Sequence, residues 1–97
     1  MIAYTARATV ATTSPDRYVK QLAAHLGHKA EIRSEPGGQR IVFAVGSCLL
    51  STQTDSLELR AESGTAEGLN RVKEITESHL ERFGQREALQ VRWLMAP

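Results

Sequence analysis

Residues 65–83 read TAEGLNRVKEITESHLERF and predict the helix around which the rest of the chain packs. At about 100° per residue, apolar side chains gather in one sector of this helix and charged or polar ones in the opposite sector. Thr65 is the expected N-cap, and Gly84 is expected to end the helix. His79 falls in the apolar sector, so we expect it to point into the protein. The apolar sector comprises Leu69, Val72, Ile75, Thr76, His79, Leu80 and Phe83.

Length and composition are those of an ordinary globular protein. The 97 residues are 41% hydrophobic and 24% charged, so one modest core is expected and a large enclosed substrate cavity is not. Twelve Lys and Arg nearly balance eleven Asp and Glu, which argues against a dedicated nucleic-acid binder. We therefore expect residues 1–97 to form a single domain that does not bind nucleic acid.

Cysteine content and hydropathy bear on the compartment. The single Cys48 excludes an intrachain disulfide and is typical of a reducing environment. The first residues contain no basic stretch followed by an apolar one, so no secretory signal is expected. The most apolar window, residues 41–50, is too short to span a bilayer. These features predict a cytoplasmic protein with no membrane association.

The other segments predict strands and a second helix. Ser14, Pro15 and Asp16 have the cap, first-turn proline and acidic residue of a helix start, and this helix should run to about Leu26. Alternating or turn-bounded segments predict the strands. The predicted strands cover residues 2–10, 30–35 and 40–45, a segment starting at residue 48, and residues 57–62 and 89–95.

The central hairpin is expected to turn at Gly46-Ser47, a pair suited to a two-residue loop. That register would place Val45 opposite Cys48, and Phe43 opposite Leu50. Cys48 would then face inward, with the other apolar side chains of the hairpin.

The predicted order is therefore β-α-β-β-β-β-α-β, without repeats or linkers. Two amphipathic helices and a mainly antiparallel sheet predict an α+β two-layer sandwich with both helices on one face. The outer face of the sheet would be solvated or would meet a partner. It would carry Thr5, Arg7, Arg60 and Arg92.

Several separated motifs resemble one bacterial family. They are Arg17-Tyr18, Gln21-Leu22, His25, His28-Lys29, Gly46, Cys48, His79-Leu80-Glu81-Arg82-Phe83, Arg86-Glu87 and Trp93. With these residues the chain resembles the bacterial domain-of-unknown-function family 2218 over nearly its whole length. That family has no established reaction. Its domains occur alone or joined to siderophore-interacting proteins, so the resemblance implies a connection with siderophore or other iron-handling partners.

His25, Cys48 and His79 are metal-ligand types that the expected fold places at the helix–sheet interface or its rim. Imidazole and thiolate suit zinc or iron, and three ligands with a water would form an open site. His28 is a candidate fourth ligand. The plainer interpretation, which we favour, is that His79 binds a backbone carbonyl and Cys48 fills the core. His25 and His28 would then simply lie at a helix end.

Two further hypotheses concern catalysis and assembly. Cys48, activated by His79 or His25, could form a minimal Cys/His enzyme, but no cysteine signature surrounds it and an inward thiol is usually inert. The sheet edge or outer face could instead form a homodimer. We therefore expect a binding or accessory module, associated with iron or zinc if the three ligands converge, rather than an enzyme.

The arginines around the end of the long helix have a structural interpretation, and so do the aromatic residues. Arg82 and Arg86 could hold a carboxylate or phosphate, but ion pairs with Glu81, Glu87 or Glu58 are the favoured interpretation. The aromatic residues expected in the core are Tyr18, Phe43, Phe83 and Trp93.

Overall fold

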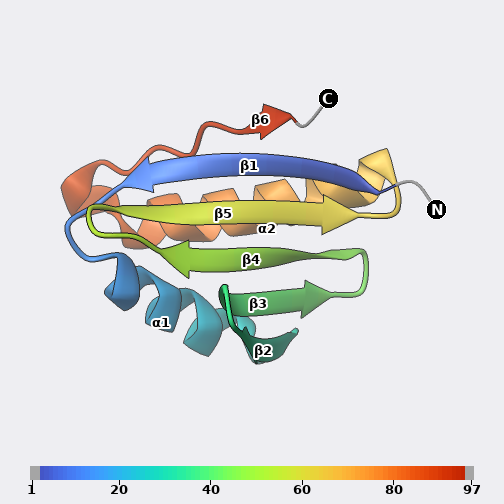
Figure 1. Cartoon of the computed structure of the whole chain (residues 1–97), viewed down its shortest axis with the longest axis horizontal. Helices are drawn as coiled ribbons and strands as arrows, with labels where there is room; N and C mark the ends of the chain where they lie inside the picture. The colour runs from blue at the N-terminus through green and yellow to red at the C-terminus, as the bar shows by residue number, and fades with distance from the viewer. Residues whose placement is uncertain (1–2, 96–97) are drawn as a thin grey trace.

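Both predicted helices lie on one face of a twisted antiparallel sheet, in a computed structural model that describes residues 3–95 (Figure 1). The fold is the predicted α+β sandwich. Its elements in chain order are β1 (Tyr4–Ala11), α1 (Pro15–Leu26), β2 (Glu31–Glu35), β3 (Gly38–Phe43), β4 (Gly46–Thr52), β5 (Ser56–Ser63), α2 (Ala66–Phe83), the short 3₁₀ helix η1 (Gln85–Glu87) and β6 (Leu94–Met95). No helix in residues 3–95 has the length and apolar character needed to cross a membrane.

The sheet has the spatial order β2-β3-β4-β5-β1-β6, and every neighbouring pair is antiparallel. The last strand is much shorter than the predicted segment 89–95, because only Leu94 and Met95 pair with β1. Before them, the backbone N–H of Val91 donates to the Glu81 carboxylate at 2.9 Å. A side chain from α2 therefore takes the hydrogen bond that a neighbouring strand would otherwise provide.

The predicted register of the central hairpin is wrong. Phe43 pairs with Gly46 and Ile41 with Cys48, so the chain turns through residues 44–45. Gly46 lies within β4, where an added Cβ would come within 2.3 Å of the Glu62 carbonyl oxygen on β5. This glycine allows a close approach between strands rather than a turn. Cys48 nevertheless faces inward as predicted and is fully buried.

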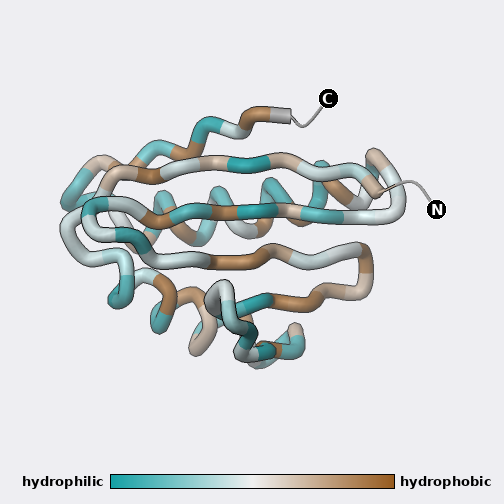
Figure 2. The backbone as a smooth tube through the Cα atoms, in the orientation of Figure 1, coloured by the Kyte–Doolittle hydropathy of each residue, from teal (hydrophilic) through white to brown (hydrophobic). Residues whose placement is uncertain are grey.

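The core lies between the inner face of the sheet and the two helices. Along most of β1 and β5, buried residues alternate with exposed or half-buried ones. Figure 2 shows that hydrophobic and hydrophilic residues change places along the same strands. Small side chains on the inner face, such as Ala6 and Ala61, leave room for α2 to pack closely. The largest fully buried apolar side chains are Leu22, Ile41, Leu50, Leu57, Leu59, Leu69 and Leu80. Of the four aromatic residues assigned to the core, Tyr18 is buried, whereas Phe43, Phe83 and Trp93 are only partly buried against it.

The helix ends agree only partly with expectation. Thr65 caps α2, since its hydroxyl accepts from the Gly68 N–H at 2.9 Å. The side chain of Ser14 makes no capping hydrogen bond to α1, although Pro15 occupies the first turn as predicted. The Ser14 backbone N–H instead donates to the hydroxyl of Thr12.

Candidate functional site

Two of the predicted site residues meet between the helices. His25 lies in the last turn of α1, and His79 lies on α2. Their ring centroids are 4.9 Å apart, with the ring planes tilted by 48°. The ring of Phe83 stands edge-on to His25 at 5.5 Å and lies 6.3 Å from His79. His25 is exposed and His79 is half-buried, so this pair lies at the rim of the core rather than inside it.

One nitrogen of His79 is fixed by the backbone of its own helix. His79 Nδ1 lies 2.7 Å from the carbonyl oxygen of Ile75, one turn earlier. Because a carbonyl oxygen only accepts, Nδ1 carries the hydrogen, and Nε2 of the neutral ring keeps its lone pair. The expected bond from His79 to a backbone carbonyl is therefore present, although the side chain is less deeply buried than expected.

Cys48 does not take part in this arrangement. Its thiol is fully buried beneath α2, and burial raises the pKa of Cys48 to about 12, an effect that the neighbouring Thr76 hydroxyl opposes only in part. The thiol therefore stays protonated and enclosed at neutral pH. Both the nucleophile and the metal-ligand role need an accessible thiolate, so the structure supports neither for Cys48.

The three-ligand metal site is likewise not supported. Within residues 3–95, no group of three His, Cys, Asp or Glu side chains has an arrangement that could hold a metal ion. His28, the candidate fourth ligand, is exposed beyond the end of α1. What remains of the predicted set is the pair formed by His25 and His79.

The histidine pair borders a groove of about 390 Å³, which lies between the end of α1, the middle of α2 and the turn from β3 to β4. We call it the histidine groove. Much of its lining is apolar, and Lys29 and Arg71 add positive charge. Sequence analysis missed Val45 because the wrong hairpin register placed it in a strand pair, and Arg71 because it belongs to the polar sector of its helix. The lining residues are His25, Leu26, Lys29, Phe43, Ala44, Val45, Arg71, Ile75 and His79.

A second polar cluster joins the start of α1 to the segment after α2. The Glu87 carboxylate accepts hydrogen bonds from the hydroxyls of Thr12, Thr13 and Tyr18 and from the backbone N–H of Thr13. We call these four residues the Glu87 cluster. The Tyr18 hydroxyl, the backbone N–H of Thr13 and the two threonine hydroxyls lower the pKa of Glu87, and the same bond to Glu87 raises the pKa of Tyr18.

The ion pairs expected for Arg82, in the last turn of α2, and for Arg86, in η1, are not formed. Arg82 and Arg86 are exposed, and neither makes an ion pair with any residue in the described part of the chain. Glu87 does not pair with an arginine because neutral hydroxyl and amide donors already surround its carboxylate. Sequence analysis could not find these donors, since Thr12 and Glu87 are 75 residues apart.

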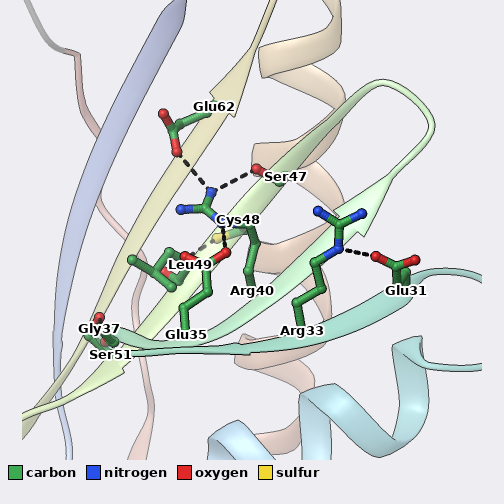
Figure 3. A network of polar contacts seen from close by, with 10 residues as sticks. All are labelled: Glu31, Arg33, Glu35, Gly37, Arg40, Ser47, Cys48, Leu49, Ser51 and Glu62. Atoms are coloured by element: carbon green, nitrogen blue, oxygen red, sulfur yellow. Dashed lines mark hydrogen bonds and ion pairs between the residues drawn. The ribbon is translucent and has the colours of Figure 1, made fainter.

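The outer face of the sheet contains a further polar network (Figure 3). Arg40 donates to Glu35 at 2.7 Å, to Glu62 at 2.8 Å and to Ser47 at 2.9 Å, and so connects β2, β3, β4 and β5. Its hydrogen bond lowers the pKa of the Glu35 carboxyl. Near the sheet edge, Arg33 pairs with Glu31. These contacts hold the hairpin of β2 and β3 against the rest of the sheet.

Comparisons with known proteins agree with this fold and with the family resemblance. The domain is an α+β sandwich that brings together motif residues from distant parts of the chain, such as His25 and His79. The chain belongs to the family described as "Uncharacterized protein conserved in bacteria (DUF2218)", whose model matches residues 7–94. No curated protein matches the chain.

Two solved structures are similar. The NMR structure of PA4090 from Pseudomonas aeruginosa has 28% identity and a TM-score of 0.77, with 94% of this chain and 95% of that one covered. A de novo designed protein with a ferredoxin fold has 8% identity and a TM-score of 0.54, with 100% and 87% covered, and shares the fold alone.

Proposed function

We propose that this domain is a small binding module that takes its ligand in the histidine groove. The observation that carries this proposal is the 4.9 Å contact between His25 and His79 at the edge of a 390 Å³ groove. The groove is within the range of about 300–1,000 Å³ usual for small-molecule sites. Its two histidines come from the separate motifs by which the sequence resembles its family.

The lining indicates the class of ligand. Phe43, Val45 and Ile75 offer apolar surface, and Val45 remains 44% exposed although it is large and hydrophobic. Lys29 and Arg71 provide two cationic groups at the same groove. Arg71 has an exposed ion-pair contact of 3.8 Å with Glu74, which is longer than a hydrogen bond and leaves its guanidinium able to bind a carboxylate through paired hydrogen bonds. A carboxylate with an aliphatic or aromatic body matches both parts of this lining. We therefore expect a small amphipathic acid to bind.

An NMR titration with octanoate tests the proposal, with octanol as the neutral analogue. Octanoate should cause saturable shifts at Lys29, Val45 and His79, and Arg71→Gln should weaken its binding about ten-fold. Arg17→Gln is the matched control, because Arg17 is an exposed arginine that does not line the groove. Equal binding of octanol, or no effect of Arg71→Gln, would refute the proposed ligand class.

A transition metal held by the histidine pair is the second candidate. It is favoured by one observation, namely that the bond from His79 Nδ1 to Ile75 leaves Nε2 free beside the ring of His25. Iron and zinc both accept imidazole ligands, and solvent would complete the coordination. This would agree with the iron-handling and siderophore-interacting partners that the family resemblance implies.

Titration of untagged protein with Zn²⁺ alone separates this candidate from the first. If the metal binds, His25→Gln and His79→Gln should each abolish stoichiometric binding, and His28→Gln should not. Binding that survives both substitutions would exclude the histidine pair. Binding of octanoate that needs no metal would favour the first candidate.

A further inference from the structure

The outer face of the sheet has one cross-strand row with an unusual composition. Strand register places these side chains next to one another across all six strands. In spatial order the row is Arg33 (β2), Arg40 (β3), Leu49 (β4), Arg60 (β5), Arg7 (β1) and Leu94 (β6).

Arg7 and Arg60 face each other directly in this row, and both are exposed. Like charges directly opposite on neighbouring strands are destabilising, so sheet stability gives no reason for this pair. Neither arginine forms an ion pair or a side-chain hydrogen bond with residues 3–95. The other two arginines of the row are compensated, Arg40 by Glu35 and Glu62, and Arg33 by Glu31 (Figure 3).

A leucine stands on each side of the arginine pair. Leu49 is opposite Arg60, and Leu94 is opposite Arg7. Leu94 is 74% exposed, the highest value among the exposed large hydrophobic residues of the described chain. Apolar surface therefore borders two uncompensated cations on both sides.

The same residues line a hollow of about 350 Å³ in the sheet face. Its wall includes the hydroxyl of Thr9, which could donate to a bound anion, and the carboxylate of Glu58, which would repel one. The hydroxyl of Ser51 also lies in this wall, but it already donates to the carbonyl oxygen of Gly37 at 2.6 Å. Both hydroxyl residues lie opposite Glu58 on neighbouring strands, in the row next to the arginines. One side of the hollow is therefore acidic, and its centre is cationic.

We propose that Arg7 and Arg60 bind the phosphate of a small organic phosphate monoester, whose apolar body lies on Leu49 or Leu94. A phosphate monoester carries close to two negative charges, which match two guanidiniums that otherwise repel each other. Cβ atoms of directly paired residues are about 4.5–5.5 Å apart, so both side chains can reach the same phosphate. The site is on the opposite side of the sheet from the histidine groove and is independent of it.

Phenyl phosphate, titrated at low salt in a buffer free of phosphate, is the test ligand, and phenol is its neutral analogue. Amide shifts should saturate and should be confined to β1, β4, β5 and β6. Arg7→Gln and Arg60→Gln should each weaken binding about ten-fold, as expected when one charged hydrogen-bonding group is lost. Glu58→Gln should tighten binding, because it removes the acid from the wall.

Arg33→Gln is the matched control, since Arg33 lies in the same row but is already paired with Glu31. It should leave the affinity for phenyl phosphate unchanged. Folding is checked by thermal unfolding: Arg7→Gln should retain or raise the Tm, because it relieves repulsion within the pair.

Three results would overturn the proposal. The first is that phenol binds as tightly as phenyl phosphate. The second is that Arg7→Gln and Arg60→Gln both bind phenyl phosphate as tightly as the wild type does. The third is that benzoate binds as tightly as phenyl phosphate. Sedimentation tests whether this face instead forms a dimer. If the same amides shift with protein concentration alone and a dimer forms, the face is an interface between two copies and the phosphate site is excluded.

Discussion

The Glu87 cluster and the histidine groove both connect α1 with the C-terminal half of the chain, but they satisfy their polar groups very differently. In the cluster, both oxygens of Glu87 accept hydrogen bonds, and the donors come from three residues near the start of α1. In the groove, His25 makes ring contacts with His79 and Phe83 but no hydrogen bond within the described residues. His79 hydrogen-bonds through Nδ1 alone, to the carbonyl oxygen of Ile75, and its Nε2 has no hydrogen bond within the described residues.

This difference separates a structural site from a binding site. A carboxylate that already accepts from four donor groups has little capacity left for a ligand, and it fixes the relative position of the segments that it joins. An imidazole with a free nitrogen beside apolar surface and two cations keeps that capacity. Substitutions in the cluster and the core should therefore affect stability, and substitutions of the groove's polar groups should affect binding.

The largest loss of stability is expected for Leu80→Ala. Leu80 is fully buried on α2, directly beside the half-buried His79. Truncation of a buried leucine lowers the free energy of unfolding by about 2–5 kcal/mol. Urea unfolding measures this value, with His79→Gln as the neighbouring control. A loss no greater than that of the control would show that α2 is rotated relative to the core.

Phe83→Ala should have a smaller effect, although sequence analysis assigned this ring to the core. Truncation of a fully buried phenylalanine lowers the free energy of unfolding by about 3–5 kcal/mol. Phe83 is only partly buried, so Phe83→Ala should lower it by about half of that amount. Because its ring packs against His25, the substitution should also weaken ligand binding in the groove. Full loss of stability with unchanged binding would place Phe83 in the interior instead.

Glu87 should make unfolding depend on pH in the acid range. The pKa of Glu87 in the folded state lies below the ordinary value of 4.5. At pH values between these two pKa values, the unfolded state therefore binds more protons than the folded state. The stability that Glu87 contributes is therefore complete above about pH 4.5 and is lost as the pH falls through the folded pKa. Thermal unfolding from pH 2 to 7 should show a shallower acid loss for Glu87→Gln. Glu74→Gln, an exposed control on α2, should follow the wild type.

Tyr18→Phe removes one donor of the cluster and keeps the buried ring. One hydrogen bond of this kind contributes about 1 kcal/mol, so the free energy of unfolding should fall by about that amount. Hydrogen bonding to Glu87 raises the pKa of Tyr18 in the folded state, so the unfolded state releases this proton first as the pH rises above about 10. The wild type should therefore lose stability from this group above about pH 10, and the variant should not. Tyr4→Phe, at an exposed position, is the control. No change in either measurement would mean that the bond between Tyr18 and Glu87 is not formed in solution.

The contrast also shows what sequence analysis could and could not predict. Local patterns located both helices and most strands, because hydrophobic period and caps are properties of neighbouring residues. The prediction of the hairpin register was wrong at Gly46, because the role of this glycine depends on the carbonyl oxygen of Glu62 in another strand. A glycine needed for close packing and a glycine needed for a turn look alike in sequence.

The candidate site was predicted only in part, for the same reason. The apolar sector of α2 predicts His79 as a candidate, and the end of α1 predicts His25, so both members of the pair follow from local patterns. The inward position predicted for Cys48 is confirmed, but the inward face extends along the whole sheet, and Cys48 forms no ligand group with the two histidines. The partners of Glu87 depend on packing between distant segments, and no local pattern identifies them.

The smallest effect on stability is expected for Lys29→Gln. Lys29 is exposed just beyond α1, and surface substitutions of this kind usually change the free energy of unfolding by less than about 0.5 kcal/mol. Octanoate binding should nevertheless weaken, because Lys29 provides one of the two cationic groups of the groove. Urea unfolding and the NMR titration, made on the same sample, measure both effects, with Lys20→Gln on α1 as the control. If Lys29→Gln behaved like that control in both measurements, the cationic part of the groove would have no role in binding and the contrast between the two regions would rest on the histidine pair alone.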